Sequence, residues 1–120
     1  MSIEVTQISL DKFEQRQLDF SRSDFMQSAA FARTQLGMGS YVGLEAVEIC
    51  NGDRLIGQSI ITYRPHMKFF KKACIYQGPL MDYSDLALVK AVISAIELYV
   101  KKKAQILEFH SSIENLIYND

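Results

Sequence analysis

The sequence predicts an α+β fold in which a mixed β-sheet is flanked by helices. The dipeptide Asn51-Gly52 separates two apolar, strand-like segments, and it favours a tight hairpin turn because both positions accept positive φ. Residues 84–103 carry apolar side chains at helical spacing. A further strand-like segment follows at 105–110. We therefore expect the long helix to pack on a sheet that contains the hairpin.

The chain begins with one predicted strand and one predicted helix. Residues 3–8 alternate as a short strand does. Ser9 is a suitable N-cap for a helix that reaches about Phe20, with Leu10 and Phe13 directed inward. This first helix is expected to end at the polar segment that follows Phe20.

A second, shorter helix and the hairpin come next. Ser28 is the expected N-cap of this helix, and Gly37 its C′ residue, because glycine enters the left-handed region freely. Residues 41–50 and 54–63 form the two hairpin strands. Proline lacks an N–H for the ladder, so Arg64-Pro65 is expected to end the second strand.

A basic loop, a third strand and the long helix complete the predicted elements. The loop holds His66, Lys68, Lys71 and Lys72, and the strand covers 73–77. Ser84 is the expected N-cap of the helix over 84–103. Its predicted buried stripe is Leu86, Val89, Ile93, Ile96 and Val100. The predicted order is β-α-α-β-β-β-α-β.

Length, composition and charge narrow the classes of protein to which the chain can belong. The chain has 120 residues, which fits one domain, and 48% of them are hydrophobic. Its formal net charge of -1 gives no electrostatic footprint for DNA. The N-terminus resembles no signal peptide, and no run approaches the length of a transmembrane segment. These features favour a cytoplasmic protein.

The positions of the cysteines and histidines in the sequence do not indicate a metal site. Cys50 and Cys74 lie far apart in apolar segments and are expected to be buried thiols. No acidic residue stands out beside His66 or His110, so we expect neither a metal centre nor a catalytic triad.

Three segments in order carry a resemblance to a known family. The first is Phe25-Met26-Gln27-Ser28, followed three residues later by Phe31. The second runs from Gly52-Asp53 into Tyr63-Arg64-Pro65. The third and most specific is Ile75-Tyr76-Gln77-Gly78-Pro79-Leu80-Met81-Asp82-Tyr83-Ser84-Asp85. Over residues 5–113 the sequence resembles the FemABX family of aminoacyltransferases.

The resemblance implies a GNAT-like fold, with residues 1–120 as one domain that is the N-terminal portion of a longer enzyme. Such enzymes transfer an amino acid from aminoacyl-tRNA to the peptide stem of a peptidoglycan precursor, either lipid II or a UDP-linked muropeptide. Amine attack on an ester needs no metal and no redox cofactor. The enzyme would be cytoplasmic, or peripheral at the inner face of the membrane.

The sequence departs from the family pattern at three places. Phe31 replaces the usual tryptophan, and Gln35 stands where a lysine is common, with Arg33 nearby. His110-Ser111-Ser112 replaces a D-P-N-like turn. These departures bear on the phosphate contacts and on the choice of acceptor, and leave the expected fold unchanged.

The resemblance directs six residues toward the acceptor, although each has a plainer structural interpretation. Asp82 and Tyr83 either contact the peptide stem or shape the turn before the helix. Tyr76 either lines the cleft or packs as a core or edge aromatic. Arg64 either holds the pyrophosphate or is solvated. Arg33 and Gln35 face the acceptor if the family register holds. No catalytic residue is assigned.

Two other functions stay open. One is an N-acyltransferase that uses acyl-CoA. The sequence lacks the glycine-rich loop of such enzymes, and Pro79 and Asp82 suit a phosphate poorly there. The other is a non-catalytic module that binds a muropeptide or a partner protein. Taken alone, the 120 residues are expected to be inactive and to form a homodimer through the open edge of strand 105–110.

Overall fold

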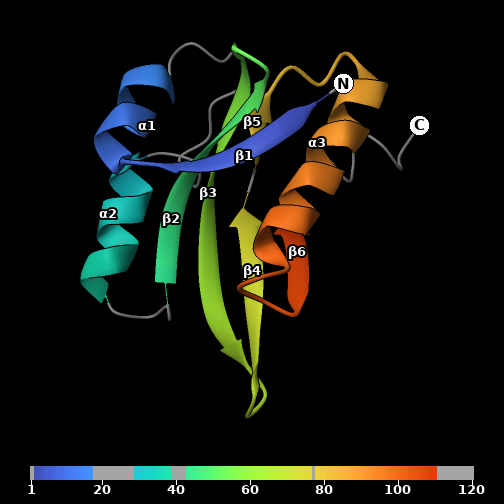
Figure 1. The fold of residues 1–120 in the computed structure, drawn as a ribbon. Coiled ribbons are helices and arrows are strands. Elements are labelled where there is room, and N and C mark those ends of the chain that lie inside the picture. Colours follow the sequence, from blue (N-terminus) through green and yellow to red (C-terminus); the bar gives the residue numbers. More distant parts are fainter. Residues whose placement is uncertain (1, 18–28, 39–42, 77, 111–120) are drawn as a thin grey trace.

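The computed structural model of the chain describes residues 2–17, 29–38, 43–76 and 78–110, with the side chains of 35–38 left aside. Its elements are shown in Figure 1. They are β1 (Ile3–Ile8), α1 (Leu10–Arg16), α2 (Ala29–Met38), β2 (Gly43–Asn51), β3 (Arg54–His66), β4 (Phe70–Tyr76), β5 (Leu80–Met81), α3 (Leu86–Val100) and β6 (Ile106–His110). Among the described residues, no helix is both long enough and apolar enough to cross a bilayer.

The strands form one mixed sheet, as the sequence predicts. Its order is β1-β2-β3-β4-β6, and β5 pairs with β3 beside this path. Every pairing is antiparallel except that of β4 with β6, which is parallel. A parallel pair needs a long crossover, and α3 supplies it. No described strand lies outside β6.

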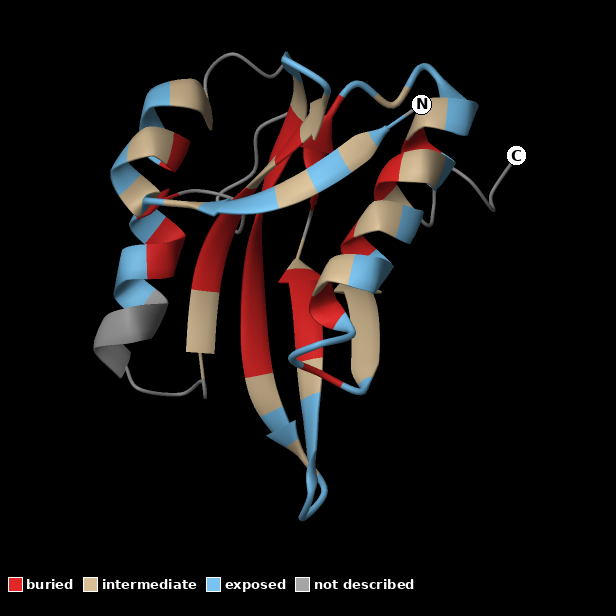
Figure 2. Ribbon diagram, viewed as in Figure 1, coloured by how far each residue is buried: buried red, intermediate tan, exposed pale blue. Residues whose placement is uncertain are grey.

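Helices cover both faces of the sheet (Figure 2). On one face, α3 buries Val89, Val92, Ile96 and Val100 against alternate residues of the central strands. Those residues are Val47, Ile49, Ile61, Tyr63, Ala73 and Ile75. On the other face, α1 and α2 pack Phe13, Ala29 and Ala32 against Ala46, Ile60 and Leu80. The expected packing of the long helix on the hairpin is confirmed.

The N-terminal predictions are largely confirmed. β1 covers residues 3–8, Ser9 caps α1 by accepting from the backbone N–H of Lys12, and Phe13 is fully buried. The expected helix end at Phe20 and the N-cap Ser28 lie outside the described residues. Gly37 was expected just beyond the second helix, which is wrong, because α2 continues through it to Met38. A helix interior tolerates one glycine at a cost of about 1 kcal/mol.

The second hairpin strand is longer than the sequence predicts. β3 continues through Pro65 to His66, and Pro65 pairs with Lys71 of β4. The pairing of β2 with β3 ends at Tyr63, so Pro65 has a neighbouring strand on one side alone among the described residues. Its missing N–H therefore breaks no ladder. The predicted basic loop shrinks to the turn 67–69, and Lys71 and Lys72 belong to β4.

The long helix is shorter and slightly rotated relative to the prediction. Asp85 caps it by accepting from the N–H of Leu88, whereas Ser84 lies before the cap. Leu86 is 53% exposed in the first turn, and Val92 is fully buried while Ile93 is partly buried. The first turn thus contributes little to the core. The fully buried positions follow the spacing of Val89, Val92, Ile96 and Val100.

Two further details differ from expectation. β5 was missed because two residues are too short for an alternating pattern. It pairs closely at Gly57, where an added Cβ would lie 2.5 Å from the carbonyl oxygen of Leu80. Cys74 is buried as predicted, whereas Cys50 is half-buried, and both are free thiols.

Truncation at the centre of α3 tests this packing. Ile96→Ala should lower the free energy of unfolding by about 2–5 kcal/mol, because Ile96 is fully buried between α3 and the sheet. Leu98→Ala on the same helix should change it by less than about 0.5 kcal/mol, since Leu98 is 68% exposed. Urea denaturation of both variants measures the difference. Equal losses would contradict the assigned helix face.

Candidate functional site

A strip of polar side chains runs along β4 and β6 to their carboxyl ends, on the sheet face opposite α3. The parallel register places Cys74 beside Glu108 and Tyr76 beside His110. The Tyr76 and His110 rings stack with their centroids 5.1 Å apart. The guanidinium carbon of Arg64, on β3, lies 5.8 Å from the Tyr76 ring centroid. Ligands of open α/β sheets typically bind at the carboxyl ends of parallel strands.

The Glu108 carboxylate interacts with two basic side chains of this strip, those of His110 and Lys72. Its carboxylate lies 2.7 Å from Nε2 of His110 and 3.4 Å from Nζ of Lys72. The hydrogen bond with His110, and then the charge of Lys72, lower the pKa of Glu108 despite partial desolvation. Glu108 is therefore an anion that holds His110 and Lys72 in place.

The strip offers two kinds of chemistry. Arg64 is half-buried beside an aromatic ring, which suits a guanidinium that is to bind phosphate or carboxylate oxygens. Separately, Cys74, Glu108 and His110 hold donor atoms within 4.8 Å of one another. Such a set suits zinc in its atom types, but Glu108 is already engaged by Lys72 and His110.

The sequence prediction found part of this strip. It selected Arg64 and Tyr76, which the structure brings together. It overlooked His110 and its acidic neighbour Glu108, which stand two residues apart on one strand. Side chains at i and i+2 of a strand share a face. That spacing was the available signal, and the statement that no acidic residue accompanies the histidines was wrong.

Asp82 and Tyr83 shape the turn between β5 and α3. The Asp82 carboxylate accepts a hydrogen bond from the backbone N–H of Ser84 at 2.9 Å. Hydrogen bonds from the Ser84 backbone and then its side chain lower the pKa of Asp82. The Tyr83 hydroxyl donates to the carbonyl oxygen of Pro79. Both residues therefore have a structural role, and Asp82 remains exposed to solvent.

Arg33 joins the first two helices. Its guanidinium lies 2.8 Å from carboxylate oxygens of both Asp11 and Glu14 on α1. These bonds, that with Glu14 first, raise the pKa of Arg33. Its guanidinium is thus occupied within the described chain. Gln35 lies in α2, and its side chain is outside the described part of the structure.

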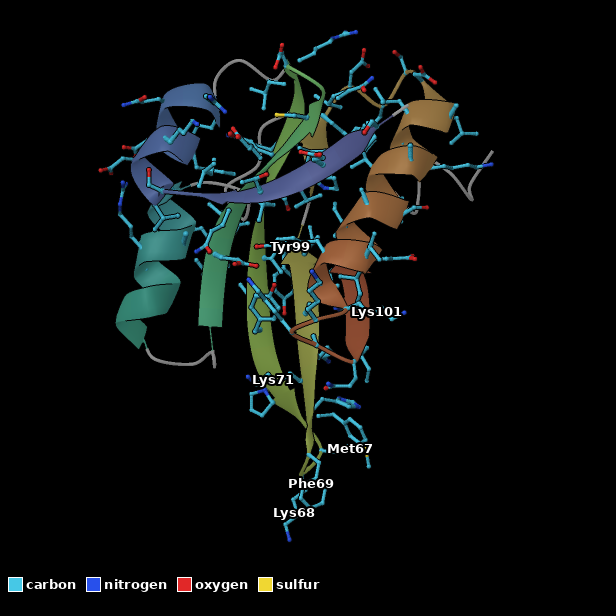
Figure 3. All side chains as sticks on the ribbon, viewed as in Figure 1. Met67, Lys68, Phe69, Lys71, Tyr99 and Lys101 are labelled. Carbon is cyan, nitrogen blue, oxygen red and sulfur yellow. The ribbon has the colours of Figure 1, made fainter. Side chains whose placement is uncertain are left out.

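A second polar group, which the sequence did not reveal, lies under the end of α3. The Tyr63 hydroxyl donates to Glu45 at 2.6 Å, and Nζ of Lys103 lies 2.9 Å from the other Glu45 oxygen. Desolvation, followed by the bond to Glu45, raises the pKa of Tyr63. Lys103 also contacts the hydroxyl of Tyr99, which Figure 3 labels. A hollow of about 310 Å³ adjoins this group.

Comparisons with known proteins identify the family and the fold of the chain. The family model for the FemAB family matches residues 5–110. The chain belongs to the FemAB family. The crystal structure of FemX is similar to this chain, with a TM-score of 0.66 and 17% sequence identity. The similar region comprises 84% of this chain and 25% of the FemX chain. This FemAB chain therefore spans about a quarter of FemX in length. No curated protein matches it.

Solved acetyltransferases share the same fold. One is the ribosomal-protein-alanine N-acetyltransferase from Brucella melitensis biovar Abortus 2308, with 11% identity, coverage of 98% of this chain and 90% of that one, and a TM-score of 0.57. Another is the glucosamine-6-phosphate N-acetyltransferase from Arabidopsis thaliana, with 10% identity, coverage of 99% and 88%, and a TM-score of 0.55. The predicted GNAT-like fold of this FemAB chain is thereby confirmed.

Titration of Asp82 tests the turn geometry. The Asp82 pKa should fall below its ordinary 3.8. Because this folded-state pKa is depressed, the carboxylate stabilises the fold above about pH 4 and loses that effect as pH falls through its folded-state pKa. Ser84→Ala should raise the pKa only partly, since the backbone N–H remains. NMR of the Asp82 carboxyl measures both; an undepressed wild-type value would contradict the turn.

Proposed function

We propose that this chain supplies the acceptor-binding part of an aminoacyltransferase of cell-wall synthesis. The donor would be aminoacyl-tRNA, and the acceptor the peptide stem of a peptidoglycan precursor. Membership of the FemAB family over residues 5–110 supports the reaction class. The observation that carries the proposal for this chain is the placement of Arg64 against Tyr76, whose ring stacks on His110 at the carboxyl ends of β4 and β6.

The chemistry of a peptidoglycan precursor fits that strip. Its pyrophosphate, carried by a UDP or a lipid, requires cations with fixed geometry, and Arg64 can bind two phosphate oxygens at once. The stacked Tyr76 and His110 rings present an amphipathic surface beside it for the sugar or the stem. Glu108 keeps His110 oriented.

The reaction itself asks little of the protein beyond positioning. An amine of the stem attacks the aminoacyl ester carbonyl, a C–N bond forms, the ester C–O bond breaks, and the terminal tRNA hydroxyl leaves with a proton. Binding the acceptor in a fixed orientation is the part assigned to this chain. We expect the 120 residues alone to bind acceptor without transferring an amino acid to it, because they span a quarter of FemX.

An acyl-CoA transferase remains the competing function, since acetyltransferases share the fold. The segment between β4 and α3 opposes it. Pro79 has no N–H to offer a pyrophosphate, and the ionised Asp82 carboxylate would repel one. Acetyl-CoA therefore serves as the competing ligand in the binding test.

Calorimetric titration with UDP-MurNAc-pentapeptide tests the proposed function. Arg64→Ala should weaken binding roughly 10- to 100-fold, as expected for loss of a hydrogen bond to a charged group. The matched control is Arg54→Ala, which removes the same side chain from the exposed start of β3 and should leave affinity unchanged. Acetyl-CoA should not bind. Binding of acetyl-CoA alone, or equal affinity of both variants, would refute the assignment.

A further inference from the structure

The β3–β4 hairpin ends in an exposed apolar tip. In Figure 1 the hairpin extends beyond the body of the molecule, and Figure 3 shows Met67, Lys68 and Phe69 at its far end. Met67 is 78% exposed, Phe69 82% and Phe70 46%. Three large apolar side chains therefore face solvent at the point farthest from the core.

The backbone conformation of Met67 is unusual for an apolar residue in a turn. Met67 has a φ of 57°, in the left-handed region. Glycine and asparagine adopt this conformation at a lower energy than methionine does. A turn that served only to connect the strands would favour those residues. The sequence instead keeps an apolar side chain at a strained position.

Basic side chains surround the tip. Residues 64–72 contain Arg64, Lys68, Lys71 and Lys72 and no acidic residue. Lys72 pairs with Glu108, whereas Lys68 and Lys71 make no ion pair within the described residues. Lys71 and Lys102 line the same hollow near the end of α3. The tip is thus apolar at its end and positive behind it.

The size of the patch indicates the kind of partner. Three side chains on a two-stranded tip are too few for a stable protein interface, which buries about 800 Å² on each partner. They do suit the boundary between lipid headgroups and acyl chains, where aromatic residues insert and lysines reach the phosphates. Anionic lipids attract such lysines.

We propose that the tip of the β3–β4 hairpin docks this chain on an anionic lipid bilayer. Met67 and Phe69 enter the interface, and Lys68 and Lys71 contact lipid phosphates. The proposal rests on the hairpin alone and does not depend on the transferase function. A membrane contact at this point would bring the neighbouring Arg64 strip close to the lipid surface.

Vesicle cosedimentation of the full chain tests the proposal. The wild-type chain should bind vesicles of phosphatidylcholine with 40% phosphatidylglycerol. Its affinity for pure phosphatidylcholine vesicles should be at least roughly tenfold lower, since each of the two lysines contributes about fivefold to the affinity for anionic lipid. The double variant Met67→Ser, Phe69→Ser should lose at least tenfold in binding. The matched control, Leu86→Ser with Leu98→Ser, removes two exposed apolar side chains from α3 and should bind as wild type does.

A fluorescence measurement locates the contact. The chain has no tryptophan, so Phe69→Trp introduces a single reporter at the tip. Its emission should shift to shorter wavelength with phosphatidylglycerol vesicles and be quenched by brominated acyl chains, whereas Leu98→Trp should show neither effect. Unshifted emission at residue 69, or equal binding of the tip variant and wild type, would overturn the proposal. The proposal would also be overturned if the wild-type chain sedimented without vesicles and the tip variant did not. That result would show that the tip contacts another protein chain.

Discussion

The packing of α3 across β2, β3 and β4 is the interaction on which the rest of the structure depends. Its buried valines and isoleucine meet alternate residues of all three strands. The same helix is the crossover that returns the chain beside β4, so that β6 pairs in parallel. Without that crossover His110 would have no reason to lie on Tyr76, and the polar strip would not exist.

Buried polar groups tie the layers together at defined points. The Gln58 amide is fully buried and donates to the carbonyl oxygen of Phe13, which fixes α1 on the sheet. On the other face, Glu45 accepts from Tyr63 and Lys103 at the end of α3. A buried carboxylate is costly unless it is paired and hydrogen-bonded, so these partners specify how α3 sits on the sheet.

The two surfaces for which we propose a role both include residues of the β3–β4 hairpin. Arg64 belongs to the polar strip, and Met67 to Phe69 form the tip only three residues further on. Pairing of Arg64 with Lys72 and of His66 with Phe70 connects Arg64 to the base of the tip through one antiparallel ladder. In a membrane-bound chain, the length of the hairpin beyond Arg64 would therefore set the height of the polar strip above the lipid surface.

The sequence by itself determined the element order apart from β5, a hairpin near Gly52, the Ser9 cap and most of the buried face of α3, because these depend on local geometry and periodicity. The expected turn at Asn51-Gly52 lies one residue further on, because Asn51 still pairs with Arg54 at the end of β2 and Gly52 alone of the two has a positive φ. It also carried the family resemblance and the GNAT-like fold. Tertiary structure alone decided that Arg33 is bound by α1 and that Glu108 and His110 lie beside Cys74 and Tyr76. Those outcomes depend on which strands and helices become neighbours, and contacts between segments distant in sequence leave no local pattern to read.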